Sequence, residues 1–211
     1  MVPLSRYVFN SLFVSIVTTA LHIVAASMAA FTFSKSKIKG RTALFLVVQF
    51  ALLYNSYTLG IPQYILMSNM RIIDTYLVYI LPYIPSAMGA FLMKQYIDSS
   101  IPDALLEAAR IDGASVFRMY WSIVMPIVRP AWMTLLLFSF KDMWSIMPNG
   151  TIFSEELKTL PYVMSQINSG GLARAGSAMA TTVIMMIPPI IVYIISQRNV
   201  METMSSAGIK D

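Results

Sequence analysis

Residues Val8–Phe33 read VFNSLFVSIVTTALHIVAASMAAFTF and contain no charged residue, with His22 as their one titratable histidine. A helix that crosses a bilayer needs about 20 mostly apolar residues, so this stretch predicts a transmembrane helix. Three further uncharged runs predict the same structure: Thr42–Leu66, Thr75–Met93 and Ala175–Ser196. A fifth span, over 123–147, contains Arg129, Lys141 and Asp142, but an alternating topology requires it.

The composition supports this interpretation for the whole chain. Hydrophobic residues make up 57% of the sequence and charged residues 12%, whereas a soluble domain has about 25% charged residues. A folded surface with so few polar groups must face lipid. We therefore predict an all-α membrane protein: a single domain over 1–211, with a bundle of five transmembrane helices at about 8–33, 42–66, 75–97, 123–147 and 175–196.

The basic residues indicate the orientation of the spans. Ser34–Arg41 reads SKSKIKGR and should be cytoplasmic, because Lys and Arg are enriched in cytoplasmic loops. Alternation then places the N-terminus outside, Met67–Asp74 outside, Lys94 to about Trp121 inside (with the loop at about 99–121), 148–174 outside and the tail from Gln197 inside. The inside segments, with Arg129, hold ten Lys and Arg residues and the outside segments four. Topology thus explains the net charge of +5, and we expect no nucleic-acid partner.

The segment Ser99–Pro126 reads SSIPDALLEAARIDGASVFRMYWSIVMP and predicts a short helix, a tight turn and a second helix in a cytoplasmic loop. Pro102 suits a first helical position, and Gly113 tolerates the left-handed conformation that a sharp turn needs. One face of the first helix collects Ala104, Leu105, Ala108 and Ala109. Such a helix either docks onto a partner through small residues or lies flat on the membrane surface.

The same segment resembles the EAA signature of ABC-importer permease subunits. The matching residues are Glu107-Ala108-Ala109, Asp112-Gly113-Ala114, Ile123 and Pro126. The resemblance extends to Ser34–Arg41, Leu77–Gln95, Gln197-Arg198 and Ala207–Lys210, which look like carbohydrate-type permeases of the maltose-importer class.

This resemblance implies a coupling helix that sits in a cleft of a cytoplasmic ATPase subunit. Glu107 would pair with a basic residue of the ATPase, Ala108 and Ala109 would permit close contact, and Gly113 would make the turn. The tail, with Gly208, Ile209 and Lys210, would approach the ATPase dimer. The family usually has six spans, so its first span has no counterpart among the five predicted here.

The resemblance also implies the partners. They are a dimer of cytoplasmic ATP-binding subunits, a second permease subunit and an extracellular solute-binding protein that faces the loop 148–174, all at a bacterial or archaeal cell membrane. The chain contains no G-x-x-x-x-G-K-[ST] sequence, so a partner must hydrolyse ATP. With no Cys and one His, we expect no enzyme activity, cofactor, metal or catalytic residue.

Several polar residues lie inside the predicted spans. Lys141 and Asp142 either extend to water at the outer interface or line a pathway. His22 is interpreted as a structural histidine. Gln49, Asn55 and Gln63 either join helices or line a cavity. In the family a Trp-Asn-Asp-like element often follows the fourth of these spans, but only Trp144 matches it here, so no sugar-contacting residue is assigned.

Two other functions remain open at this point. An ABC permease for a peptide or an amino acid would carry the same signature. A secondary transporter would instead show internal repeats and buried charge networks, and neither is evident in the sequence.

Overall fold

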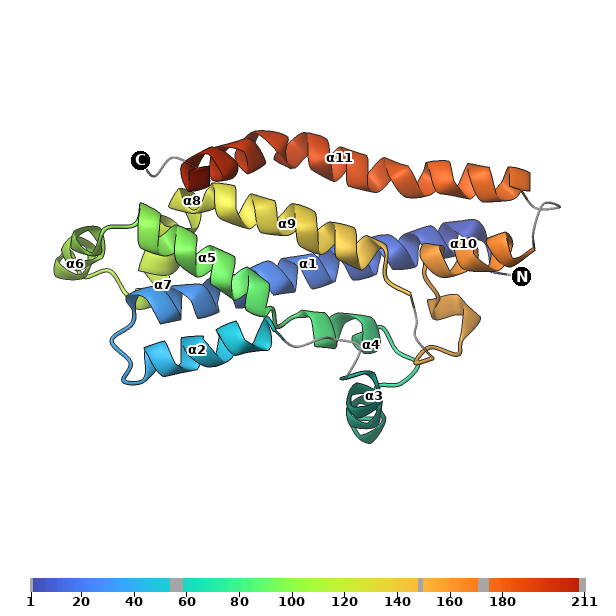
Figure 1. Ribbon diagram of the computed structural model, residues 1–211, viewed down its shortest axis with the longest axis horizontal. Helices are drawn as coiled ribbons and strands as arrows, with labels where there is room; N and C mark the ends of the chain where they lie inside the picture. Colours follow the sequence, from blue (N-terminus) through green and yellow to red (C-terminus); the bar gives the residue numbers. More distant parts are fainter. Residues whose placement is uncertain (1, 54–58, 148–149, 171–174, 209–211) are drawn as a thin grey trace. The chain divides into compact units, whose positions relative to one another are not determined.

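The computed structural model of the protein describes residues 2–53, 59–147, 150–170 and 175–208 (Figure 1). Within those ranges the chain forms helices and no β-strand, which confirms the predicted all-α class. The helices, in chain order, are α1 (Leu4–Lys35), α2 (Arg41–Ala51), α3 (Gly60–Asn69), α4 (Leu77–Ile80), the 3-10 helix η2 (Leu81–Tyr83), α5 (Ala87–Ser100), α6 (Asp103–Ile111), α7 (Val116–Met119), the π-helical turn η3 (Tyr120–Val124), α8 (Met125–Ile127), α9 (Arg129–Trp144), the 3-10 helix η4 (Glu155–Leu157), α10 (Leu160–Ser169) and α11 (Ala175–Gly208).

The chain divides into two compact units. Unit 1 comprises Met1–Leu21, Asn55–Ile84 and Leu137–Ile195. Unit 2 comprises His22–Tyr54, Pro85–Leu136 and Ser196–Asp211. Each unit is therefore assembled from segments that lie far apart in the sequence, and the single permease domain over 1–211 stays a prediction.

Two described helices are long and apolar enough to cross a bilayer by themselves, namely α1 and the part of α11 from Ala175 to Asn199. They contain the predicted spans 8–33 and 175–196. The total rises to four if each of two bent helix pairs is counted as one span. The number of five spans stays a prediction.

The predicted span 42–66 is not one continuous helix in the described residues. The helix α2 ends at Ala51 and belongs to unit 2, whereas α3 begins at Gly60 and belongs to unit 1. Pro62 lies in the first turn of α3, where its missing N–H costs no hydrogen bond, so the chain starts a new helix there. Hydropathy did not reveal this break because both pieces are apolar.

Prolines interrupt the other two predicted spans. The span 75–97 comprises α4 and η2 in unit 1 and α5 in unit 2, with Pro85 at the junction. In the span 123–147, the helix over Val116–Ile127 meets α9 at 80°. Pro130 has no N–H to donate to the carbonyl of Pro126, which interrupts the helical ladder next to Val128. The predicted span 123–147 is therefore a 16-residue helix, α9, preceded by a sharp turn.

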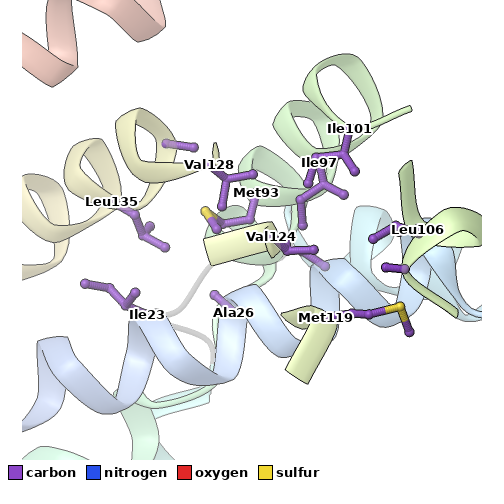
Figure 2. Close-up of a cluster of buried hydrophobic side chains, with 13 residues drawn as sticks. Ile23, Ala26, Met93, Ile97, Ile101, Leu106, Met119, Val124, Val128 and Leu135 are labelled. Atoms are coloured by element: carbon purple, nitrogen blue, oxygen red, sulfur yellow. The ribbon is translucent and has the colours of Figure 1, made fainter. Parts of the chain in front are cut away.

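The core of unit 2 is formed by side chains from α1, α5, α6 and the segment that leads into α9 (Figure 2). Its members are Ile23, Ala26, Ala30, Met93, Ile97, Ile101, Leu106, Ala109, Met119, Val124, Val128, Ala131 and Leu135. Small residues on α1 let a neighbouring backbone approach closely, which is how helices pack in membranes. At Gly89 of α5, an added Cβ would lie 3.1 Å from the Cβ of Ala26.

Unit 1 has two smaller apolar clusters, and both include residues from the first half of α1. Val14 packs with Met67, Ile72, Val78, Tyr79 and Ile152, and Tyr7 packs with Phe140, Trp144 and Leu160. Trp144 also donates a hydrogen bond from Nε1 to the carbonyl of Met185 at 2.9 Å, which joins α9 to α11.

Candidate coupling site

The short helix predicted around Glu107 is α6, which lies at the end of unit 2 beyond α5 and α7 (Figure 1). Pro102 is the N-cap residue, with an extended backbone, and Asp103 places a negative charge in the first turn. A carboxylate there interacts favourably with the helix dipole. Pro102 thus immediately precedes the first helical residue rather than occupying it.

The C-terminus of α6 has the geometry of a Schellman motif. The N–H of Ala114 donates to the carbonyl of Ala109 at 2.9 Å, and the N–H of Gly113 donates to the carbonyl of Arg110 at 3.0 Å. Gly113 has φ of +79°, in the left-handed region that glycine adopts at no steric cost. The turn that the sequence predicted at Asp112-Gly113 is therefore present, and it ends α6 after nine residues.

The orientation of α6 differs from the predicted one at Ala109. Leu106 and Ala109 are buried, at 4% and 9% exposure, and both belong to the core of unit 2. Residues three apart share one helix face, so a buried Leu106 carries Ala109 inward with it. The prediction that Ala109 shares an exposed face with Ala108 is wrong, although Ala104, Leu105 and Ala108 are exposed.

Five of the exposed residues of α6 and α7 provide one carboxylate, one small side chain and three apolar side chains. Glu107 and Ala108 are exposed. Ile111 is 87% exposed, Val116 62% and Phe117 67%. The apolar residues were not singled out from the sequence, because in a chain this apolar they do not stand out. We call these five residues the α6–α7 surface.

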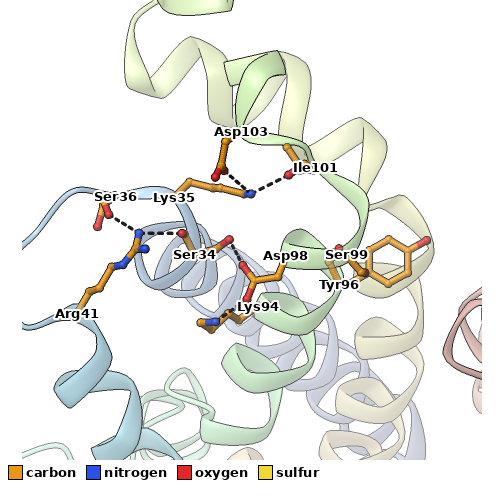
Figure 3. Close-up of polar contacts among 10 residues, drawn as sticks. All are labelled: Ser34, Lys35, Ser36, Arg41, Lys94, Tyr96, Asp98, Ser99, Ile101 and Asp103. Carbon is orange, nitrogen blue, oxygen red and sulfur yellow. Dashed lines mark hydrogen bonds and ion pairs between the residues drawn. The ribbon is translucent and has the colours of Figure 1, made fainter. Parts of the chain in front are cut away.

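A group of charged and polar residues connects α6 to the ends of α1 and α5 (Figure 3). Lys35, the last residue of α1, donates from Nζ to Asp103 Oδ1 and to the carbonyl of Ile101, both at 2.7 Å. Asp98 of α5 accepts from the hydroxyl of Ser34 and, at 2.5 Å, from Lys94. These contacts attach the start of α6 to two helices of unit 2.

The hydrogen bond from Lys35 lowers the pKa of Asp103, because it stabilises the charged carboxylate. Arg41 donates to the carbonyls of Ser34 and Ser36, at 2.9 Å and 2.6 Å, and so satisfies backbone groups at the end of α1. A pocket of about 190 Å³ lies between this basic segment and α6, lined by Ser34, Lys35, Lys37, Arg41, Asp103, Leu106, Glu107 and Arg110.

Glu107 lines that pocket, and within the part of the chain that the structure describes it forms no ion pair. Its charge is thus available to a basic group of another molecule. The described residues hold no group of three or more His, Cys, Asp and Glu side chains that could bind a metal ion. The arrangement suits protein docking.

The remaining predicted site residues are not among the five of the α6–α7 surface, and some lie outside the described residues. Asp112 is the exposed C-cap residue of α6, and Ala114 is half-buried against the core of unit 2. Pro126 lies in α8, next to the 80° bend. Gly208 is the last residue of α11, and Ile209 and Lys210 lie outside the described residues.

The polar residues predicted within spans belong to different units or lie outside the described residues. Lys141 and Asp142 are exposed in the last turn of α9. Gln49 belongs to unit 2, Gln63 to unit 1, and Asn55 lies outside the described residues. Gln63 lines a pocket of about 210 Å³ in unit 1, together with Tyr64, Tyr79 and Tyr83 among others.

His22 is half-buried on α1, and its Nε2 would lie 3.1 Å from a Cβ added at Gly89. That position places it in the packing between α1 and α5 within unit 2. Its interpretation as a structural histidine stays a prediction.

Sequence reasoning missed Asn10, which is fully buried in α1. Its Nδ2 donates to the carbonyls of Glu156 and Lys158, both at 2.8 Å, and its Oδ1 accepts from the hydroxyl of Tyr76 at 2.7 Å. A polar amide inside an apolar run is the signal that could have identified it. Through Asn10, α1 holds the backbone of the loop that precedes α10.

Residues 8–205 match the family model described as "Binding-protein-dependent transport system inner membrane component". The arabinooligosaccharides transport system permease protein AraQ of Bacillus subtilis is 27% identical over 207 residues, which cover 97% of this chain and 73% of that protein. The lactose transport system permease protein LacG of Rhizobium radiobacter is 26% identical over 198 residues, covering 93% of this chain and 72% of that protein.

A solved structure of a bacterial ABC transporter involved in the import of the acidic polysaccharide alginate shares the fold. Its TM-score is 0.81 at 23% identity, over 92% of this chain and 74% of that one. The family and the relatives confirm that the chain is a transport subunit and not an enzyme, and the family implies a binding protein and an ATP-hydrolysing partner. The chain belongs to the family of binding-protein-dependent transport system inner membrane components, as a permease subunit of an ABC importer.

Proposed function

We propose that this permease translocates a sugar or an oligosaccharide, and that α6 is the helix through which a separate ATPase drives it. The observation that carries the coupling role is the α6–α7 surface at the end of unit 2. It presents a carboxylate, Glu107, that no cation of the described residues pairs with, beside a small residue, Ala108, and a highly exposed Ile111. A helix with these three features can enter a cleft, bury an apolar side chain and pair with one cation.

The sugar class is supported by the relatives, whose names specify arabinooligosaccharides and lactose and whose matches span nearly the whole chain. An extracellular binding protein would deliver the substrate, a dimer of cytoplasmic ATP-binding subunits would hydrolyse ATP, and a second permease would complete the pathway. The chain would be a multi-pass protein of a bacterial or archaeal cell membrane.

The basic segment Ser34–Arg41 supports the predicted orientation of the site. Lys35 of this segment contacts Asp103 of α6, so the positive-inside rule that assigns the segment to the cytoplasm assigns α6 to it too. The loop over 150–159, which Asn10 and Asp74 hold in unit 1, would face the binding protein on the outer side.

Charge reversal at Glu107 tests the coupling role. In Glu107→Lys, we expect the complex to remain in the membrane and ATP hydrolysis to lose its dependence on the binding protein, because the cation opposite Glu107 would now be repelled. Lys39→Glu is the matched control, since it reverses a charge at an exposed residue outside α6. The coupling role would be contradicted if both variants kept ATPase activity that the binding protein stimulates as in the wild type.

The substrate class requires a separate measurement. The binding protein that co-purifies with this permease in mild detergent should be titrated calorimetrically with arabinobiose, lactose, a dipeptide and an amino acid. Binding of a sugar supports the proposal, whereas binding of the peptide or amino acid alone assigns the permease to that class of importer.

A further inference from the structure

Besides the core side chains Leu106 and Ala109, α6 has three attachments to the rest of unit 2, and one of them is a charge pair that the chain connections do not provide. The covalent connections run to α5 through Ile101-Pro102 and to α7 through Asp112–Ser115. The third attachment joins α6 to α1: Lys35 is bonded to Asp103 and to the carbonyl of Ile101 (Figure 3). We infer that Lys35 is a positioning residue: when the ATPase displaces α6, Lys35 makes α1 move together with α6.

The environment of Lys35 supports this role. Its side chain is 8% exposed, although it carries a full charge, whereas that of Asp103 is 80% exposed. A buried ammonium is stable only if its donors are satisfied, so both acceptors matter to its position. One acceptor is a carboxylate of the first turn of α6, and the other is the carbonyl immediately before Pro102.

Apolar contacts also join the start of α6 to α1, but they do not fix its position as the hydrogen bonds of Lys35 do. Ile101 is 1% exposed and, with Leu106, belongs to the cluster that also contains Ala26 of α1 (Figure 2). Hydrophobic contacts are non-directional and allow sliding. The two hydrogen bonds from Lys35 are directional and fix where along α1 the start of α6 is held.

Asp98 completes the attachment from α5. It accepts from Ser34, the neighbour of Lys35, and from Lys94, one helical turn away on α5. The end of α1 is therefore bonded through consecutive residues to α5 and to α6. This arrangement would transmit displacement of α6 to α1 directly, in addition to the covalent route through α5.

This inference rests on the proposed coupling role of α6, and its test uses the complete complex purified with its ATPase, second permease and binding protein. The chain contains no Cys, so Ala104→Cys on α6 and Met28→Cys on α1 can each carry one spin label. Both residues are exposed and belong to unit 2. The distance between the labels is measured without nucleotide and with ATP plus vanadate.

With Lys35 in place, we expect one narrow distance distribution that is the same in both states. In Lys35→Met, which keeps the apolar stem, we expect ATP plus vanadate to raise the fraction of complexes outside that distribution about fivefold, because two hydrogen bonds are lost. Lys35→Arg should restore the narrow distribution, since it keeps the charge. Lys39→Met, an exposed control in the same segment, should behave like the wild type.

A Lys35→Met distribution that matches the wild type in both states would overturn the inference. If the complex with Lys35→Met does not assemble, the same distance measurement on Asp103→Asn tests the inference, because this variant weakens the same charge pair at a side chain exposed to solvent. The proposed function fails on a different result: a wild-type complex that contains no ATPase, or one whose label distances from α6 to the ATPase do not respond to nucleotide. The two failures are therefore distinguishable.

Discussion

Replacement of Gly113 by alanine tests whether the turn that ends α6 is required for docking. Gly113 has φ of +79°, and a Cβ added there would meet no other atom within 4 Å. The cost of Gly113→Ala is therefore conformational and not steric. An L-residue in the left-handed region costs about 1–2 kcal/mol. If the native turn is only marginally stable, this cost lowers the fraction of molecules that have the turn by roughly 5- to 30-fold.

The assay compares three variants in the affinity of the purified membrane subunits for the ATPase. We expect Gly113→Ala to weaken the affinity by up to that factor, because only the fraction of molecules with the native turn can bind. Gly113→Asn should retain most of it, because asparagine tolerates the left-handed region better than other side chains. Equal affinities for the alanine and asparagine variants would refute the argument, as would an alanine variant that binds like the wild type.

Two further predictions concern packing and the outer loop. Gly89→Val should lower the melting temperature of the complex, because even the Cβ of the valine would lie 3.1 Å from the Cβ of Ala26. Gly60→Val is the control for the loss of a glycine, because no atom lies within 4 Å of a Cβ added at Gly60. In the outer loop, Asp74 accepts hydrogen bonds from the N–H groups of Phe153 and Ser154, at 2.9 Å and 2.8 Å, and from the hydroxyl of Ser154. The hydrogen bond from the Ser154 hydroxyl lowers the pKa of Asp74 from its ordinary value of 3.8. A lowered pKa means that the ionised form stabilises the fold, so this contribution is complete above the ordinary pKa and is lost as the pH falls through the lowered one. Limited proteolysis of the loop should therefore accelerate below about pH 3.8. The Asp74→Asn variant should lose most of that acceleration. If its proteolysis depended on pH as in the wild type, the stabilising role given to ionised Asp74 would be wrong.

The local structure of α6 could be predicted from the sequence because local chemistry determines it. Pro102 and Asp103 favour a helix start, and Gly113 supplies the one residue type that adopts positive φ without penalty. Neither signal depends on what surrounds the helix. The rotation of α6 does depend on its surroundings, and for that reason the exposure of Ala109 was predicted wrongly.

The continuity of the spans could not be predicted from hydropathy. An average over a window responds to composition, and an apolar helix that stops at Ala51 and resumes at Gly60 has the same composition as an unbroken one. The sequence did contain a signal, since Gly60 and Pro62 resemble a helix start. Pro130 is a similar case, with the bend falling at Val128.

Contacts between distant residues were beyond sequence reasoning altogether. Lys35 and Asp103 are 68 positions apart, and Asn10 and Glu156 are 146 apart. In the sequence, Lys35 counted only as one of several charges that set topology, and Asn10 as one residue of an uncharged run. Their roles depend on which helices pack together, and one sequence without homologues contains no direct record of that.

The two long helices differ in how much of the apolar span is buried inside the protein, and α1 is the more buried of the two. On α1, the hydroxyl of Ser11 accepts from the N–H of Leu160 at 2.8 Å, and that of Ser27 is bonded to the hydroxyl of Tyr120 at 2.6 Å. Buried polar contacts of this kind form where helices pack against protein. On α11, large apolar side chains remain exposed along the span, including Met179, Val183, Met186, Ile187, Ile190, Ile191, Ile194 and Ile195.

The polar contacts of α1 act on its orientation more strongly than apolar contacts with lipid do. An exposed apolar face does little to fix the rotation of a helix in lipid, because lipid tails interact equally with every apolar face. The bonded groups of α1, which are Ser11, Ser27, the buried amide of Asn10 and the ammonium of Lys35, are satisfied together in one orientation of the helix. The helix α1 is continuous from Leu4 to Lys35, and it contributes Asn10 to unit 1 and Lys35 to unit 2.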